Sequence, residues 1–98
     1  MAKYGDQITH TYTDPKGGTT KFKLQHVGFE KADEILDTIR QGENGLSMRT
    51  LRKQLFEHVI FTEENGKVDY AFFEDRDFGS AMLTDVTTAA QNYIFPKA

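Results

Sequence analysis

The sequence contains no cysteine and no long apolar run. Without cysteine, the chain forms no disulfide, has no thiol nucleophile and cannot bind zinc through sulfur, which fits a reducing compartment such as cytosol. No stretch approaches the ~20 apolar residues that a membrane-spanning helix needs. Residues 1–18 are polar and rich in threonine, unlike a secretion signal. The sequence therefore predicts a soluble protein without a membrane partner.

A strong charge of either sign is also lacking. The net charge is −3 over 98 residues, so the chain has no basic surface of the kind that binds nucleic acid. A chain of this length suits one domain with a modest core. Because no repeat, low-complexity block or linker divides the sequence, we predict a single domain over residues 1–98.

Catalytic and metal-binding motifs are absent as well. The histidines at positions 10, 26 and 58 fall on three predicted elements without metal-ligand spacing, so we interpret them as structural or exposed. A divalent-cation site is one alternative for the acidic side chains Glu63, Glu64, Asp69, Glu74, Asp75 and Asp77. They lack the residue order of a calcium loop, which favours a solvated acidic segment. We predict no enzyme, no cofactor and no metal site.

The N-terminal part has the alternating pattern of β-strands. Ile8, His10 and Tyr12 alternate with threonines, and residues 14–18 (Asp-Pro-Lys-Gly-Gly) have turn chemistry. Phe22 and Leu24 then fall on one face of a second strand, with polar residues on the other. The pattern predicts an antiparallel hairpin over residues 6–27 with one face toward solvent.

Residues 29–95 have helical periodicity, and with the hairpin they predict an α+β fold with a small bundle of about three α-helices. The first helix runs from Glu30 to Arg40, with Gly42 as its C-cap. Ser47 caps the second, which ends near Phe61, and Asp77 or Ser80 caps the third. The expected apolar stripes of the three helices are Phe29, Ala32, Leu36 and Ile39; Met48, Leu51, Leu55 and Val59; and Met82, Val86, Ala89, Ala90 and Tyr93.

Residues 55–73 are ambiguous. Leu55 to Ile60 continues the second helical pattern, yet Asn65-Gly66 is a strong hairpin turn signal between two apolar segments. We favour the helix followed by an extended segment or loop, and a second short hairpin around Asn65-Gly66 is the alternative.

Two clusters of large side chains are candidates for binding a partner. A domain this small needs most of its aromatics in the core, so burial is the default interpretation. Adjacent Phe72 and Phe73 would nevertheless face opposite ways in an extended chain, and large residues close to a terminus are difficult to bury. We predict that these clusters form an oligomer or client surface: Phe61, Tyr70, Phe72, Phe73 and Phe78, and then Tyr93, Ile94 and Phe95.

The order of features over residues 19–73 resembles the small tail assembly chaperones of long-tailed bacteriophages, particularly those of Gram-positive hosts. The resemblance rests on a strand reading Phe-x-Leu-Gln-His-x-Gly at positions 22–28, followed by a helix and an Asn-Gly break at 44–45. The next helix ends Leu-x-Glu-x-Val-Ile at 55–60, and Phe73-Glu74-Asp75 closes an acidic-aromatic stretch.

This resemblance implies a function in virion assembly. Such chaperones bind the long, helical, aggregation-prone tape measure protein, keep it soluble and help to recruit the major tail protein. They act in the host cytoplasm, are absent from the mature virion and are expected to form homo-oligomers. A soluble scaffold with adaptable apolar surface suits this task because the contacts are weak and repeated.

Two other functional classes are alternatives to the chaperone. One is a structural component of the virion, such as a tail terminator or connector subunit, which would assemble into rings without a helical client. The other is a small inhibitor or adaptor of host proteins, which would form a complex of fixed stoichiometry with one host protein.

Overall fold

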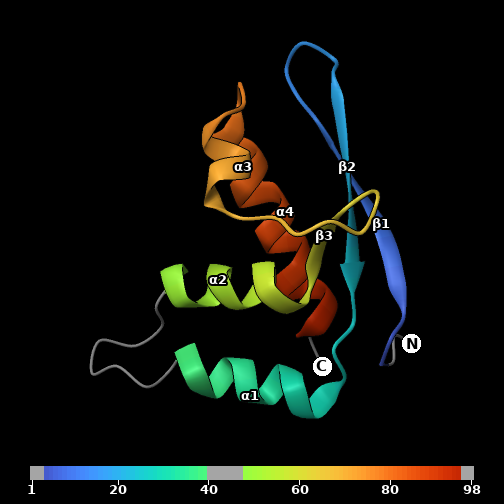
Figure 1. Ribbon diagram of the computed structural model, residues 1–98, viewed down its shortest axis with the longest axis vertical. Helices are drawn as coiled ribbons and strands as arrows, with labels where there is room; N and C mark the ends of the chain where they lie inside the picture. Colours follow the sequence, from blue (N-terminus) through green and yellow to red (C-terminus); the bar gives the residue numbers. More distant parts are fainter. Residues whose placement is uncertain (1–3, 40–47, 96–98) are drawn as a thin grey trace.

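The computed structural model describes residues 4–39 and 48–95. The fold is α+β, as predicted, and a three-stranded antiparallel sheet packs against the helices (Figure 1). The elements follow in the order β1 (Gln7–Thr13), β2 (Thr19–Gln25), α1 (Phe29–Ile39), α2 (Met48–His58), β3 (Ile60–Thr62), α3 (Tyr70–Glu74) and α4 (Gly79–Ile94). Several expected features lie outside the described residues, namely Arg40, Gly42, the Asn44-Gly45 break, Ser47 and the side chain of Ile39.

The predicted hairpin is confirmed, and a third strand joins it. β1 pairs with β2 from Gln7 opposite Gln25 to Thr13 opposite Thr19. Phe22 and Leu24 are fully buried on the face that meets the helices, as the alternation predicted. β3 lies on the other side of β2, which gives the strand order β1-β2-β3.

The ambiguous segment combines a shorter helix, a strand and a tight turn. α2 ends at His58 rather than near Phe61, because the following residues pair with β2. A turn does form around Asn65, where the Thr62 amide donates to the Gly66 carbonyl at 2.8 Å. The chain then enters α3 instead of a second long strand, so only one bridge, Phe61 to Lys67, represents the alternative hairpin.

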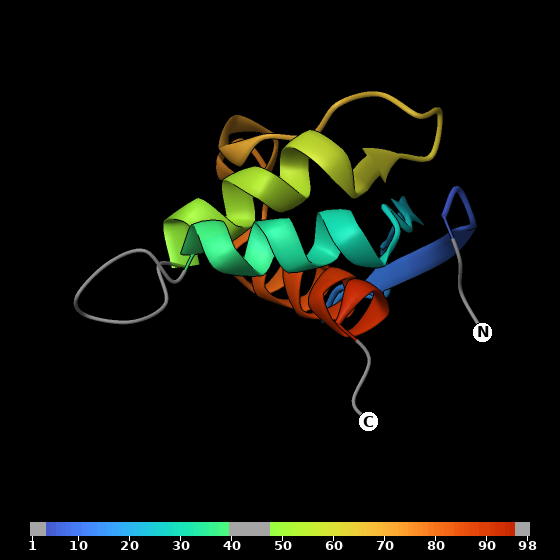
Figure 2. The ribbon, with the colours of Figure 1, turned by 90° about the horizontal axis from the view of Figure 1, so that it is seen from below.

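α1 and α2 form an antiparallel pair beside the sheet (Figures 1 and 2). Ala32 and Ile35 of α1 are buried, whereas Phe29 is 58% exposed, so the expectation of a core position for Phe29 was wrong. The buried side of α1 is therefore turned toward Ile35, and Phe29 at the first position lies edge-on against the His26 ring, with 5.7 Å between ring centroids.

The expected stripe of α2 also needs one correction. Leu51, Leu55 and Phe56 of this helix are buried, as is Val59 just after it. Met48, at the first position of the expected stripe, is 47% exposed and does not belong to the buried side of the helix. A side chain in the first turn can leave the packed face because it leans back beyond the end of the partner helix.

α4 crosses the inner face of the sheet and contacts all three strands as well as α2 and α3 (Figure 1). Met82, Val86, Ala90 and Ile94 form its buried side, which largely confirms the predicted stripe. Neither Asp77 nor Ser80 is the N-cap. Phe78 holds that position in the left-handed region, at φ 62°, without a side-chain hydrogen bond to the helix.

Candidate partner-binding surface

The corner between α3 and α4 determines which aromatic side chains reach the surface. Asp69 caps α3, since its carboxylate accepts a hydrogen bond from the Phe72 amide at 3.0 Å. At the other end of the corner, Gly79 packs directly on the backbone of Phe73, and a Cβ built at Gly79 would overlap the Phe73 carbonyl oxygen. Only glycine fits this close approach, so the sequence fixes the direction in which α4 leaves α3.

The predicted aromatic cluster divides at this corner. Phe73 is 2% exposed and stacks on Phe22 and Phe56, so it belongs to the core and is not available to a partner. Phe72 and Tyr70 are partly buried, and Phe78 is exposed. The adjacent phenylalanines lie on a short helix rather than an extended strand, and their rings contact each other with 5.2 Å between the centroids, so they do not face opposite ways.

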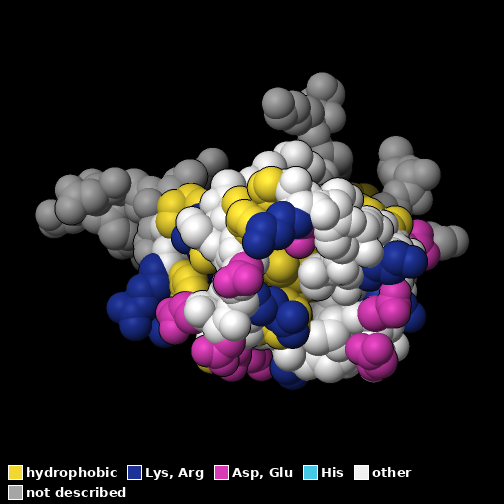
Figure 3. Space-filling view, turned by 90° about the horizontal axis from the view of Figure 1, so that it is seen from above, with side chains coloured by type: hydrophobic (Ala, Val, Ile, Leu, Met, Phe, Trp, Pro, Cys, Tyr) yellow, Lys and Arg dark blue, Asp and Glu magenta, His cyan; other side chains and the backbone are white. Residues whose placement is uncertain are grey.

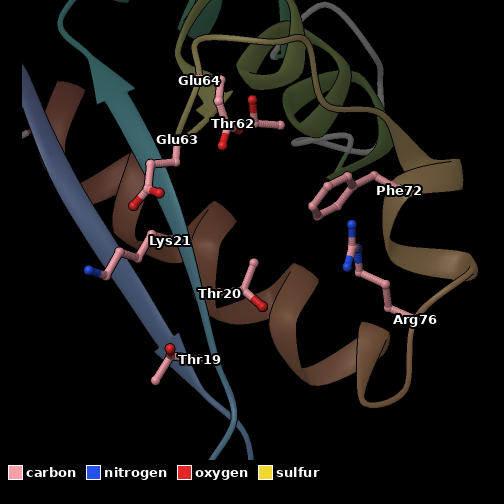
Figure 4. Close-up of a pocket in the computed structure, with 8 residues that line it drawn as sticks. All are labelled: Thr19, Thr20, Lys21, Thr62, Glu63, Glu64, Phe72 and Arg76. Atoms are coloured by element: carbon pink, nitrogen blue, oxygen red, sulfur yellow. The ribbon is translucent and has the colours of Figure 1, made fainter.

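Phe72 and Arg76 line a cleft between the hairpin, the end of β3 and α3. We call this cavity of about 540 Å³ the α3 cleft; Figure 4 shows its lining residues, Thr19, Thr20, Lys21, Thr62, Glu63, Glu64, Phe72 and Arg76. The Arg76 guanidinium lies 4.0 Å from the centroid of the Phe72 ring. Thr20 and Arg76 point toward the middle of the cleft, whereas Lys21 extends away from it. The cleft thus combines an aromatic surface with charges of both signs.

A second hollow lies between β1 and α4. This hollow of about 810 Å³, the Tyr12 groove, is lined by Tyr12, Phe78, Ser80, Ala81, Thr84, Asp85 and Thr88. Among these residues, the sequence analysis identified only Phe78 as a candidate for binding a partner. The signal that could have found the others is the row of small side chains at positions 81, 84 and 88, on the side of α4 opposite its apolar stripe.

The second predicted cluster is held against the hairpin. The Tyr93 hydroxyl donates a hydrogen bond to the Asp6 carbonyl oxygen at 3.1 Å, and the ring lies edge-on to His26 with a centroid distance of 5.4 Å. Burial raises the pKa of Tyr93, and the charge of Asp6 adds to the effect. Ile94 is 1% exposed and is a core residue rather than a partner contact. Phe95 is partly buried, so this end of α4 offers little free apolar surface.

Phe61 is separate from both clusters. It lies on β3 opposite Lys23, on the outer face of the sheet, and the Lys67 ammonium is 5.2 Å from its ring centroid. The eight predicted residues therefore do not form one surface. Tyr70, Phe72 and Phe78 gather around the corner, and Phe61 and the residues 93–95 lie elsewhere.

The three histidines lie at different places in the fold, on β1, just after β2 and at the end of α2. His26 is buried and its Nδ1 accepts a hydrogen bond from the Gly28 amide at 2.9 Å, so it is a structural residue, one of the two interpretations given to the histidines. His10 Nε2 lies 2.6 Å from the Asp85 carboxylate. Burial, assisted by the charge of Lys31, lowers the pKa of His58.

The face of the molecule that is seen from above carries charges of both signs (Figure 3). Seen from above, apolar side chains are interspersed with basic and acidic ones (Figure 3). In the residues that the structure describes, no three His, Asp or Glu side chains come close enough to hold a metal ion. No helix within the same residues is both long and apolar enough to cross a membrane.

Comparisons of the chain with protein-family models, curated proteins and solved structures found no match. The candidate surface therefore has to be judged from its own geometry.

Proposed function

We propose that the protein is a phage tail assembly chaperone. In this function it binds helical segments of the tape measure protein in the host cytoplasm, keeps that protein soluble and helps to recruit the major tail protein. The order of features over residues 19–73 supports the proposal through the family resemblance.

The observation that carries the proposal is the chemistry of the α3 cleft. Phe72 offers a partly exposed aromatic surface, and Arg76 lies across its ring at 4.0 Å. Glu63 and Glu64 add carboxylates at the rim. An amphipathic client helix has an apolar stripe flanked by charges of both signs, so this mixture suits many such helices without demanding one sequence.

Binding of this kind is weak at each site. The cleft is lined by eight residues, whereas each side of a stable protein interface typically has about 20–30 residues. A long helical client with several similar segments could be covered by several copies of the chaperone, and the contacts together would hold it in solution. The proposal therefore requires many copies per client rather than one tight complex.

The first experiment is co-expression with a tape measure protein from the same source, followed by measurement of the soluble client and of the mass of the complex by light scattering. Arg76→Glu reverses a charge in the α3 cleft, and Lys53→Glu makes the same change at an exposed position of α2. We expect wild type and Lys53→Glu to keep the client soluble in complexes with many copies. Arg76→Glu should lose most of that soluble client while circular dichroism remains unchanged.

Two results would contradict the proposal. A client that stays insoluble while the wild-type chain elutes alone would exclude the chaperone function, and equal behaviour of the two variants would exclude the α3 cleft as the binding site.

The free edge of β1 favours one second candidate, a self-assembling structural component of the virion. A closed ring formed without client would support that candidate.

A further inference from the structure

The two edges of the sheet differ in how they are protected from association. β3 is only three residues long, is followed by Glu63 and Glu64, and is partly covered by the bridge from Phe61 to Lys67. β1 is seven residues long and forms the outer strand, with no described element paired to its far side (Figure 1). It contains no charged residue and no proline. Charges and prolines are the usual means of preventing edge-to-edge pairing, so β1 is an unprotected edge.

The hydrogen bonds at the two ends of the hairpin show which backbone groups face this edge. The His26 amide donates to the Asp6 carbonyl at 2.8 Å, and the Asp14 amide donates to the Gly18 carbonyl at 2.8 Å. Both pairs continue the register of β1 and β2 by one residue. Hydrogen-bonded and non-hydrogen-bonded pairs alternate in an antiparallel ladder. The even-numbered residues of β1 therefore bond to β2, and Gln7, Thr9, Thr11 and Thr13 direct their amides and carbonyls outward.

We propose that β1 pairs antiparallel with β1 of a second copy of this chain, about a twofold axis through His10, to form a continuous six-stranded sheet. This register places Gln7 opposite Thr13 and Thr9 opposite Thr11 of the other copy. Every outward-facing residue of the strand then meets an outward-facing residue, and the full length of both strands is used. A shift by one residue would bring outward groups against inward ones, so the alternation excludes it.

The side chains fit the same register on both faces of the sheet. On the outer face, Thr9 of each copy meets Thr11 of the other, a favourable cross-strand pair. On the helix face, Ile8 meets Tyr12, which joins a β-branched and an aromatic side chain. Ile8 is 45% exposed in the single chain, and its position beside Tyr12 of the other copy lies at the Tyr12 groove. A second copy therefore covers the apolar surface that one chain leaves open, and His10 at the axis stays bonded to its own Asp85.

The inference concerns self-association and stands without the proposed client. Its first test is sedimentation of the free protein over a wide concentration series, for wild type and for Thr11→Pro. Proline is tolerated at an edge position whose amide faces solvent, but there it removes a donor and blocks pairing. We expect a concentration-dependent dimer for wild type and a monomer with unchanged circular dichroism for Thr11→Pro. A wild-type protein that remains monomeric throughout, or a folded Thr11→Pro variant that still forms dimers, would overturn the proposal.

A pair of double variants tests the register and does not depend on proline. Thr9→Glu with Thr11→Glu places like charges opposite each other across the axis, although within the chain each glutamate faces a lysine of β2. Thr9→Glu with Thr11→Lys places opposite charges across the axis instead. We expect the first variant to be monomeric and the second to form dimers, with both folded. If the two variants associate equally, the proposed register is refuted. Equal association would mean that residue 9 of one copy does not face residue 11 of the other.

Discussion

Gly79 is the position at which the structure makes its sharpest prediction about stability. An added Cβ would overlap the Phe73 carbonyl oxygen and come 2.8 Å from its carbon, and both atoms belong to the backbone. A flexible side chain could rotate away from such a contact, but the backbone of α3 cannot. Gly79→Ala therefore forces α3 and α4 apart at the corner where Phe73 enters the core.

The expected cost follows from overpacking. Inserting a methyl group into a well-packed site typically costs 1–3 kcal/mol, and we expect about 3 kcal/mol here because the neighbour is main chain. A domain of this size has a total stability on the order of 5–15 kcal/mol, so the loss is a large fraction of it. With a urea m-value of about 1–3 kcal/mol/M, the midpoint should fall by roughly 1–3 M.

The measurement is urea unfolding followed by far-UV circular dichroism, with Ser80→Ala as the matched control. Ser80 is the next residue, is exposed and gains helix propensity as alanine, so the control should be neutral or slightly more stable. A Gly79→Ala protein with a midpoint equal to wild type would refute the close approach of the two helices. An altered m-value would instead indicate a change in compactness.

Three other predictions concern residues at different places in the fold. Burial lowers the pKa of His58 below 6.5, so at acidic pH the unfolded chain binds a proton at this residue more readily than the folded chain does. The free energy of unfolding should therefore decrease as the pH drops below 6.5. In a pH series of urea midpoints, His58→Gln should reduce this decrease. Tyr93→Phe removes a hydrogen bond to a backbone carbonyl and should cost about 0.5–1.5 kcal/mol in thermal unfolding, whereas Tyr4→Phe at an exposed site should cost nothing measurable. Ile35→Ala should cost about 2–5 kcal/mol and Phe29→Ser far less, because only Ile35 is in the core; the reverse order would refute the orientation of α1.

The sequence was sufficient to predict those elements in which the spacing of apolar residues matches the residues that are buried. The alternation at Phe22 and Leu24 gave the hairpin, and Met82, Val86 and Ala90 gave the buried side of α4. Sequence reasoning failed where tertiary contacts decide. Residues 60–62 are not helical because their backbone groups pair with those of β2. Phe78 is the N-cap of α4 because Gly79 packs against the backbone of Phe73.

The candidate site was less predictable than the fold for a physical reason. In a small domain, the local sequence around a buried aromatic residue does not differ recognisably from that around an exposed one. Phe72 is partly exposed and Phe73 is buried only because of how the two side chains pack. The Tyr12 groove is harder still to predict, because it brings together small residues of α4 and one aromatic from β1 that are distant in the sequence.

The two proposals together make a prediction that neither makes alone. The α3 cleft is lined by the hairpin and α3, whereas the proposed dimer contact follows the outer edge of β1, so both surfaces can be occupied at once. A dimer would then present two clefts related by the twofold axis, and a client with repeated helical segments would be held by avidity.

Thr11→Pro separates these effects because it alters the edge and leaves the cleft intact. We expect this variant to bind one isolated client helix as wild type does, in a titration followed by fluorescence anisotropy. In co-expression it should keep less of the full-length client soluble, since avidity can exceed single-site affinity by about 10²–10⁴-fold. Full solubilisation by a monomeric variant would show that the dimer plays no part in client binding. Loss of binding to the isolated helix would instead show that the edge of β1, and not the α3 cleft, contacts the client.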